Sequence, residues 1–354
     1  MNIAQIGSVD GKTGGVSIYI NYLINKKINN QINYYKLIEN NGTNKGQEIY
    51  FRIRYNFFSV INRIVDLFYI VKKYDINIFH AHTQRASFLI FLLSFFLKFK
   101  FIYTPHGFRH SQLSGLKKII HLFIEKLILS RVNVLILLSS KEKKILDIFY
   151  KNKINFKIID TYVDIKFKKN KISLLENKIK DHIVIGTVAN IYSIKQPELF
   201  FSIAKKFLNI NKKIKFIWIG NSLEEKYKNY FKKNKLNNII HFSNVERNQV
   251  LNILSKIDYF ILTSFFETFP LALLEALSLG KTCIVNNYNG VDEIIKNKIN
   301  GYLFDFNDKN SAFNIINYLV KKKIKIKKSF LISETKKYRN YITFISKHEH
   351  IYFN

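Results

Sequence analysis

Residues 259–280, YFILTSFFETFPLALLEALSLG, combine a short apolar strand with a helix that begins near a proline. The strand is expected at Tyr259–Thr263. Pro270 suits the first turn of a helix, where its missing N–H is not needed, and Gly280 suits the helix stop. A helix of about nine residues is therefore expected from Phe269. Its free N–H groups form a binding site for a phosphate or a carboxylate.

Two glutamates lie at this helix, Glu267 just before it and Glu275 inside its apolar string. A buried carboxylate is costly unless hydroxyl groups or cations meet it. At ~1.5 Å per helical residue the two side chains can be roughly 10 Å apart, a span that suits two sugar rings with a phosphate between them. The alternative is that both are solvated surface residues, the usual place of glutamate.

Short apolar runs alternate with helical patterns along the rest of the chain. Strands are expected at Asn2–Ile6, Ile76–His80, Phe99–Thr104, Val132–Leu138, His182–Val188, Ile214–Gly220, Ile239–Phe242, Tyr259–Thr263 and Thr282–Asn286. Strands separated by helices indicate parallel α/β sheets. The lysine-rich passage Lys166–Asp181 interrupts this pattern, so we place a domain boundary there.

The chain has 354 residues, more than one hydrophobic core usually serves, which favours two domains. We predict an α/β fold of two Rossmann-like, doubly wound domains facing across a cleft. They comprise residues 1–168 and 169–335, followed by a tail, 336–354, that can cross back to the first domain. In such folds ligands bind beyond the carboxyl ends of the strands, so the candidate site residues are those that follow strands.

The composition is strongly basic, with 57 lysines and arginines against 25 aspartates and glutamates and a formal net charge of +32. Such an excess suits nucleic acid, a membrane surface or acidic substrates. The abundance of Lys, Asn, Ile, Phe and Tyr also matches a preference for A/T-rich codons. Because no basic helix, zinc-finger spacing or aromatic RNA-binding pattern occurs, nucleic acid is not an expected partner.

The compartment is expected to be the cytoplasm. A single cysteine, Cys283, cannot form an internal disulfide, and Met1–Gly7 resembles a strand rather than a signal peptide. The longest apolar run, Phe88–Leu97, is shorter than the ~20 residues that cross a bilayer, and a buried helix is expected there.

The stretch GSVDGKTGGV, residues 7–16, has some features of the phosphate-binding loop of nucleotide hydrolases. That loop needs four residues between its first glycine and the Gly-Lys-Ser/Thr. Only three residues separate Gly7 from Gly11, so the sequence excludes it.

Glu267 and Glu275, with seven residues between them and Gly280 following, resemble the Glu-x7-Glu motif of the retaining family 4 glycosyltransferases, which have the GT-B fold. The resemblance covers about His182–Asp305. It implies that Glu267 contacts the transferred sugar and that Glu275 holds the ribose hydroxyls of the nucleotide. The backbone amides implied to bind the diphosphate and the sugar are those of Thr268, Phe269 and Leu271.

The same family usually has an arginine and, five residues later, a lysine that both reach the donor diphosphate. Lys195 fits the lysine, whereas Asn190 stands at the arginine position and Tyr192 at the position used in a variant of the motif. One diphosphate cation is therefore missing. The alternative is that Lys195 is a solvated surface lysine.

In the first domain, Gly14 and Gly15 resemble the Gly-Gly turn that the family places against the donor phosphate and the acceptor. A plain tight turn is the alternative. The segment FIYTPHGFRH is similar to a histidine motif of bacterial polysaccharide and glycolipid transferases, which implies that His106 faces the transferred sugar. A structural histidine is the alternative.

No metal or cofactor is expected. The chain contains no Asp-x-Asp, the usual cue for a metal at a donor diphosphate, and His80 and His82 lack a third ligand in the sequence. Lys195 and the helix terminus near Pro270 would then have to stabilise the negative charge that develops on the leaving group.

A helix expected around residues 116–131 combines apolar and basic residues: Leu116, Ile119, Ile120, Phe123, Leu127 and Ile128 with Lys117, Lys118, Lys126 and Arg131. Such a helix suits contact with anionic lipids at the inner face of the cytoplasmic membrane. Packing of the apolar stripe into the core is the alternative.

The resemblance implies a retaining, metal-independent glycosyltransferase that moves a sugar from a nucleotide-diphosphate sugar to a hydroxyl of a glycan or a lipid-linked acceptor. A noncatalytic binder of sugar nucleotides or glycans is the alternative, which Asn190 and Tyr192 favour.

Overall fold

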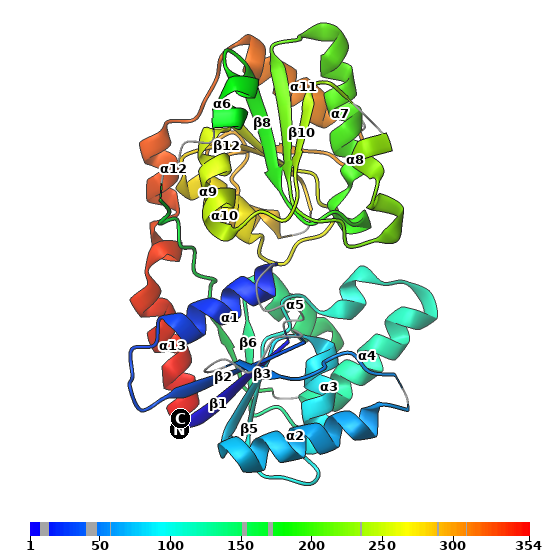
Figure 1. Cartoon of the computed structure of the whole chain (residues 1–354), viewed down its shortest axis with the longest axis vertical. Helices are drawn as coiled ribbons and strands as arrows, with labels where there is room; N and C mark the ends of the chain where they lie inside the picture. Colours follow the sequence, from blue (N-terminus) through cyan, green and yellow to red (C-terminus); the bar gives the residue numbers. More distant parts are fainter. Residues whose placement is uncertain are drawn as a thin grey trace. The chain divides into compact units, whose positions relative to one another are not determined.

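The computed structural model describes residues 1–7, 14–39, 48–56, 58–150, 154–168, 173–233, 236–288, 290–308 and 310–354. The chain divides into two compact units. Unit 1 comprises Met1–Tyr162 and Asn340–Asn354, and unit 2 comprises Val163–Arg339. Each unit consists of a sheet with helices on both faces (Figure 1).

The unit 1 sheet is parallel, with the strand order β3-β2-β1-β4-β5-β6-β7. Its strands are β1 (Asn2–Ile6), β2 (Asn33–Ile38), β3 (Glu48–Tyr50), β4 (Ile78–Ala81), β5 (Lys100–Tyr103), β6 (Val134–Leu137) and β7 (Phe156–Ile158). The order reverses direction between β1 and β4. At such a switch point the loops at the carboxyl ends diverge and leave room for a ligand.

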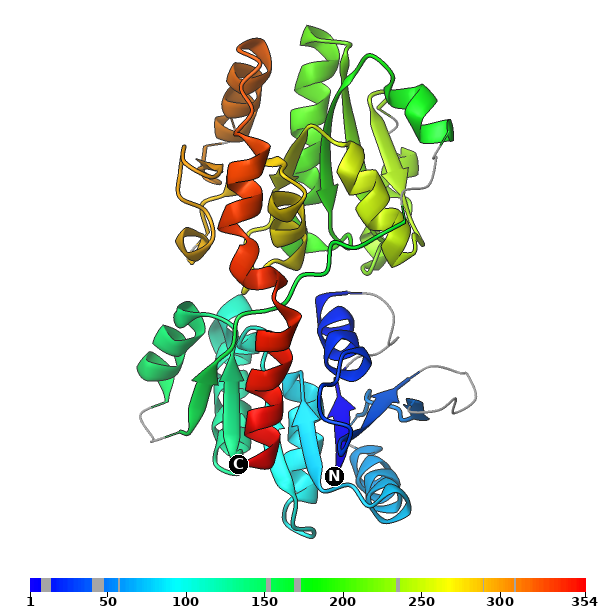
Figure 2. The same cartoon turned by 90° about the vertical axis from the view of Figure 1, so that its left-hand side faces the viewer.

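The unit 1 helices are α1 (Gly15–Asn25), α2 (Val60–Tyr74), α3 (Gln84–Leu93), α4 (Gly115–Leu129), α5 (Ser140–Phe149) and α13 (Tyr341–Phe353), with the 3₁₀ turn η1 (Arg109–Gln112). One sheet face packs on α2, α3 and α4 through residues such as Phe79 and Phe101. In Figure 2, α13 runs beside the sheet of unit 1. The C-terminal segment therefore completes the first unit.

The unit 2 sheet is also parallel, in the order β10-β9-β8-β11-β12-β13. Its strands are β8 (Ile183–Val188), β9 (Ile214–Ile219), β10 (Ile239–Phe242), β11 (Tyr259–Leu262), β12 (Thr282–Asn286) and β13 (Tyr302–Phe304). Counted from β8 this is the 3-2-1-4-5-6 order of dinucleotide-binding sheets. The switch point lies between β8 and β11.

The helices of unit 2 are α6 (Ser173–Ile179), α7 (Pro197–Ile210), α8 (Tyr230–Lys233), α9 (Arg247–Lys256), α10 (Leu271–Ser278), α11 (Ser311–Lys321) and α12 (Lys328–Glu334). Short 3₁₀ turns are η2 (Ser193–Lys195), η3 (Glu225–Tyr227), η4 (Val291–Glu293) and η5 (Lys336–Arg339). Helices α9, α10 and α12 cover one sheet face, and α7 and α11 cover the other.

The predicted fold class is confirmed, and each expected strand has a counterpart whose ends differ by at most two residues. The strands β2, β3, β7 and β13 were not predicted. The division between the units falls at Tyr162, before the expected residue 168, because Val163 is buried in the unit 2 core and its N–H bonds to the carbonyl of Tyr338 at 2.8 Å.

Candidate functional site

The carboxyl ends of β8 and β11 bring Lys195 and Glu267 together. Lys195 ends the turn η2 and Glu267 lies in the loop after β11. Their Nζ and Oε1 atoms are 2.5 Å apart, and the side chains are only 15% and 12% exposed. Burial alone lowers the pKa of Lys195, but the Glu267 carboxylate outweighs this effect and raises it. Lys195 is therefore not a solvated surface lysine, and unit 2 holds an ion pair at its switch point.

Two further bonds fasten the loops that carry this pair. The N–H of Phe265 donates to the Ile194 carbonyl at 2.8 Å, and the Thr263 hydroxyl donates to the Lys195 carbonyl at 2.7 Å. Tyr192 also lies beside the ammonium group, with 5.6 Å between the Lys195 Nζ and the ring centroid. The position of Lys195 is thus set by the fold before a ligand arrives.

Glu275 is buried inside α10, with 1% of its side chain exposed. Its carboxylate forms an ion pair with the guanidinium of Arg247, the first residue of α9. The surface alternative for Glu275 is therefore wrong. The sequence reasoning missed Arg247, although a carboxylate in an apolar helix requires a cation and the chain has few arginines.

The helix α10 begins at Leu271, two residues later than expected. Pro270 is the N-cap residue, with φ −72° and ψ 103°, and not part of the first turn. Its carbonyl accepts the N–H of Leu273 at 3.1 Å. Thr268 and Phe269 lie in the loop before it, where the Phe269 ring packs edge-on against Tyr338 with centroids 5.5 Å apart. Thr268, Phe269 and Leu271 thus lie between the two glutamates at the entry to α10.

Asn190 has a structural contact of its own. Its side-chain oxygen accepts the N–H of Asn221 at 3.2 Å, which joins the loops after β8 and β9. Gly220 makes this close approach possible, because a Cβ there would lie 2.0 Å from the Ala189 carbonyl oxygen and its φ is 151°. A neutral amide stands where the family has a cation.

In unit 1, Gly14 and Gly15 lie at the start of α1. Gly14 is the N-cap with φ 85°, a conformation that favours glycine, and Gly15 is the first helical residue. A Cβ added to either residue meets no atom of the described residues within 4 Å. Residues 8–13 of the glycine-rich stretch lie outside the described residues.

His106 follows β5 with a φ of 50°, in the left-handed region that is costly for a residue with a side chain. Glu142 of α5 secures this loop, since its Oε1 accepts the N–H of Gly107 at 2.7 Å and its Oε2 accepts that of Leu138 at 2.6 Å. The His106 ring lies against His82, with the Nε2 of His106 3.1 Å from the Nδ1 of His82. Burial and the charge of His348 lower the pKa of His106 to about 3, so the ring is neutral.

Histidines His80 and His82 are both buried in unit 1. The ring nitrogens of His80 contact Tyr352 and Thr104, and those of His82 contact Gln5 and His106. Among the described residues, no group of three His, Cys, Asp or Glu side chains is arranged to hold a metal ion.

Helix α4 exposes much of its apolar stripe. Ile128 is buried against the unit 1 core and Leu127 is partly buried. The first half is exposed: Leu116 by 72%, Ile119 by 63%, Ile120 by 47% and Phe123 by 62%. Core packing therefore explains only the C-terminal half of the helix. None of the helices in the described part of the chain is long and apolar enough to span a membrane.

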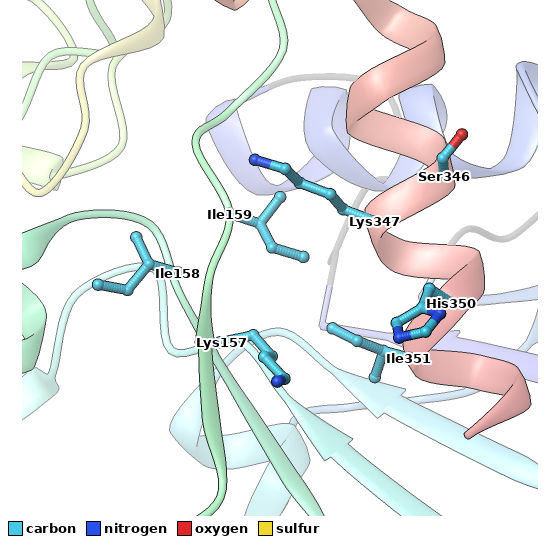
Figure 3. Close-up of a pocket in the computed structure, with 7 residues that line it drawn as sticks. All are labelled: Lys157, Ile158, Ile159, Ser346, Lys347, His350 and Ile351. Carbon is cyan, nitrogen blue, oxygen red and sulfur yellow. The ribbon is translucent and has the colours of Figure 1, made fainter.

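A hollow of about 440 Å³ lies between α13 and the segment that contains β7. Figure 3 shows its lining, which consists of Lys157, Ile158, Ile159, Ser346, Lys347, His350 and Ile351. It includes none of the predicted site residues.

The chain is similar in sequence to known proteins. Residues 168–338 match the model of the family described as Glycosyl transferases group 1. The UDP-Gal:alpha-D-GlcNAc-diphosphoundecaprenol alpha-1,3-galactosyltransferase of Escherichia coli is 28% identical over 270 residues, which cover 72% of this chain and 68% of that protein. An uncharacterized 41.2 kDa protein in the cps region of Klebsiella pneumoniae is 25% identical over 330 residues, 89% of each chain.

The fold is also similar to solved structures. Anabaena HepE in complex with UDP-glucose superposes with a TM-score of 0.83 over 100% of both chains at 16% identity. Sucrose-phosphate synthase from Thermosynechococcus elongatus has a TM-score of 0.79 at 14% identity, covering 99% of this chain and 98% of that one. Residues 168–338, almost all of unit 2, thus carry the domain of the group 1 glycosyltransferases, and the whole chain has the GT-B fold.

Proposed function

We propose that this glycosyltransferase moves a sugar, with retention of its anomeric configuration, from a uridine diphosphate sugar to a hydroxyl of a lipid-linked or cell-surface glycan acceptor. The Escherichia coli relative, by its name, uses UDP-Gal and a diphosphoundecaprenol-linked acceptor. The HepE structure contains UDP-glucose. Retention rests on the resemblance of the two glutamates to the Glu-x7-Glu motif.

The observation that carries the proposal is the Lys195–Glu267 ion pair at the switch point of unit 2. In our assignment Glu267 contacts the transferred sugar and Lys195 contacts the diphosphate. An ammonium group placed where the leaving phosphate gains charge stabilises the transition state, and its fixed position avoids reorganisation. Glu275 holds the ribose hydroxyls, and the amides of Thr268, Phe269 and Leu271 bind the phosphates.

Asn190 leaves Lys195 and the N-terminal end of α10 to meet the diphosphate charge. We assign no metal and no cofactor to the reaction, and the donor sugar nucleotide is a substrate. Accordingly, the transfer rate should be the same with 5 mM magnesium and with excess EDTA; a rate that depends on the metal would contradict this assignment.

In unit 1, we assign Gly14 and Gly15 to close backbone approach by the ligands and His106 to contact with the transferred sugar. Among the described residues no atom lies within 4 Å of a Cβ placed on either glycine, and the backbone of His106 is strained. Both observations support these roles, since strain is retained mainly where function requires it.

The alternative function is a noncatalytic binder of sugar nucleotides, which Asn190 and Tyr192 favour because they replace a cation. Purified protein is mixed with a panel of UDP-sugars and a diphosphoundecaprenol-linked sugar, and UDP release is followed. We expect release from one donor, its loss in Glu267→Gln, and full activity in the control Glu225→Gln, whose carboxylate is 82% exposed. If the wild type binds UDP but forms no UDP from any of the UDP-sugars, the protein is the noncatalytic binder.

We further propose that the exposed half of α4 rests on an anionic bilayer, on its cytoplasmic side. Apolar residues there alternate with Lys117 and Lys118, so apolar insertion and attraction to anionic lipid act together. The bilayer is where a lipid-linked acceptor resides.

Sedimentation with vesicles tests this surface. The wild type should bind vesicles of phosphatidylglycerol and not of phosphatidylcholine, and the double variant Ile119→Ser/Phe123→Ser should lose most of this binding. The control is Ile210→Ser/Leu223→Ser, two residues of unit 2 that are 57% and 63% exposed. Equal losses in both double variants would refute a specific role of α4.

A further inference from the structure

The face of the unit 1 sheet that meets α13 carries an unusual set of polar residues. Alternation along β1 and β4 turns Ala4, Ile6 and Phe79 toward the apolar core, and therefore turns Gln5 and His80 toward α13. Gln5, His80 and His82 are completely buried. Buried polar groups in such a place need partners, and these groups find one another.

Tyr352 of α13 is at the centre of this set. Its hydroxyl lies 2.8 Å from the Nδ1 of His80, and it accepts the side-chain N–H of Gln5 at 3.1 Å. The other ring nitrogen of His80, Nε2, lies 2.8 Å from the Thr104 hydroxyl oxygen. A tyrosine hydroxyl that donates to His80 keeps its oxygen lone pairs for the amide of Gln5.

From Gln5 the hydrogen bonds continue to His106. The Oε1 of Gln5 is 2.7 Å from the Nε2 of His82, and the Nδ1 of His82 is 3.1 Å from the Nε2 of His106. A chain of three hydrogen bonds thus joins the C-terminal helix to the histidine that we assign to the transferred sugar.

The direction of the protons follows from the chemistry of these groups. An amide oxygen only accepts, so the Nε2 of His82 must carry a hydrogen. A neutral imidazole has one N–H, so the Nδ1 of His82 accepts and the Nε2 of His106 donates. The proton of His106 is then on Nε2, and its Nδ1 is the accepting nitrogen.

The rings are neutral, as this reasoning requires. Burial is the main cause that lowers the pKa of both His82 and His106, and neighbouring histidines lower them further. His348, also on α13, shows the same behaviour: its Nδ1 donates to the Phe344 carbonyl at 2.8 Å, which leaves its Nε2 to accept the Tyr19 hydroxyl at 2.7 Å.

We propose that Gln5, held by Tyr352 of α13, is a positioning residue that selects the tautomer of His106 with the proton on Nε2. In this tautomer the Nδ1 of His106 is a hydrogen-bond acceptor. The role of His106 at the sugar rests on the proposed function, whereas its tautomer does not.

The tautomer is read directly by nuclear magnetic resonance of ¹⁵N-labelled protein, because long-range ¹H–¹⁵N spectra distinguish a protonated ring nitrogen from an unprotonated one. The His106→Gln spectrum identifies the signals of His106. We expect the Nε2–H tautomer of His106 in the wild type at pH 7.5, without any ligand.

Two variants test the cause. In Tyr352→Phe the Gln5 amide loses the acceptor that orients it, and in Gln5→Met the oxygen facing His82 is gone. Both should yield a mixture of His106 tautomers, and the transfer rate should fall about 10- to 100-fold, as is typical when an orienting group is removed. The second variant keeps the test decisive if the first fails to fold.

Tyr34→Phe is the matched control. The Tyr34 ring packs edge-on against Tyr352 with centroids 6.1 Å apart, and its buried hydroxyl has no hydrogen-bond partner among the described residues. Its removal should change neither the tautomer nor the rate.

An Nδ1–H tautomer in the wild type, or an unchanged tautomer in folded Gln5→Met, overturns the proposal. These readings need no catalysis, so they differ from a failure of the proposed function, in which the tautomer is as expected but no sugar is transferred by the wild type.

Discussion

Lys195 and Glu267 show how far single residues could be assigned from the sequence. Both follow apolar strands, and parallel strands that are neighbours in the sheet bring their carboxyl ends to one place, so their meeting was predictable. The Arg247–Glu275 pair was not, because it joins two helices and arginine at the start of α9 follows no local rule. The bond between Gln5 and Tyr352 spans 347 positions, and no local pattern reports such a contact.

Replacement of Lys195 by Met should lower kcat about 10²- to 10³-fold, the usual effect of removing one group that stabilises charge in the transition state. Steady-state kinetics with the preferred UDP-sugar measures this. Lys256→Met, which breaks a half-exposed pair with Glu176 in the same unit, should keep the wild-type rate. A Lys195→Met enzyme with normal kcat would show that Lys195 does not act on the leaving group.

Gly15→Ala decides whether the glycine pair is a ligand-binding turn or a plain turn. The new methyl group meets no atom of the described residues, and alanine favours helices, so the free energy of unfolding should stay level or rise by up to about 1 kcal/mol. The methyl group should nevertheless lower the transfer rate, since it fills space that the ligand needs. Denaturant unfolding and kinetics on the same sample give both numbers, and a stable variant of full activity would establish the plain turn.

Among the helices and strands, those with strong apolar runs were predicted. The short edge strands were not, and neither was β2, which lies inside the unit 1 sheet. β3, β7 and β13 have three residues each, and their pairing depends on neighbours far along the chain. For α10, the helical conformation and the end of the helix at Gly280 were predicted, because Gly280 has the positive φ of 73° that a helix end favours. Its start was wrong, because proline is as suited to the N-cap geometry found here as to the first turn.

The contact between α9 and α10 depends on one ion pair. Arg247→Met should leave the buried Glu275 carboxylate without its cation and lower the free energy of unfolding by about 3 kcal/mol, the lower end of such losses because Arg247 is 33% exposed. The double variant Arg247→Met/Glu275→Gln should recover much of this loss. A double-mutant cycle by denaturant unfolding measures the coupling, and a value near zero would mean that the pair does not join the helices.

As the pH falls, unit 1 should lose stability before unit 2 does. The pKa values of the unit 1 histidines His80, His82, His106, His110 and His348 are all lowered, mainly by burial, to about 3 for His106 and to about 4 for His110 and His348. Folded histidines therefore stay neutral while unfolded ones gain protons below pH 6.5, so the stabilising effect is complete above pH 6.5 and is lost as the pH falls toward 4. Each histidine contributes up to about 1.4 kcal/mol per pH unit.

Glu125 acts in the opposite direction, because burial raises its pKa to about 7, but it is one group against five histidines. The single tryptophan, Trp218, is buried in unit 2 and reports that unit alone. Between pH 7.5 and pH 5 the melting temperature from circular dichroism should fall more than that from Trp218 fluorescence. Equal shifts of both signals would contradict this ordering.

At the scale of the whole chain, the two-domain α/β plan followed from length and from the alternation of strands and helices. A tail that can cross back to the first domain was expected, but the polar contacts of α13 with the unit 1 sheet were not, because they join residues far apart along the chain. No pattern in the sequence distinguishes Tyr352 and His348 from other helix residues.

The central claim is that unit 2 binds a sugar nucleotide at Glu267 and Glu275. The most direct test is thermal unfolding, followed by Trp218 fluorescence, against a panel of nucleotide sugars and free nucleoside diphosphates, in the wild type, in Glu275→Gln and in the control Glu225→Gln. A ligand at 100 times its dissociation constant stabilises by about 2.7 kcal/mol. We expect a shift for one nucleotide that persists in Glu225→Gln and disappears in folded Glu275→Gln. An equal shift in all three proteins would place the nucleotide elsewhere and contradict binding at Glu275.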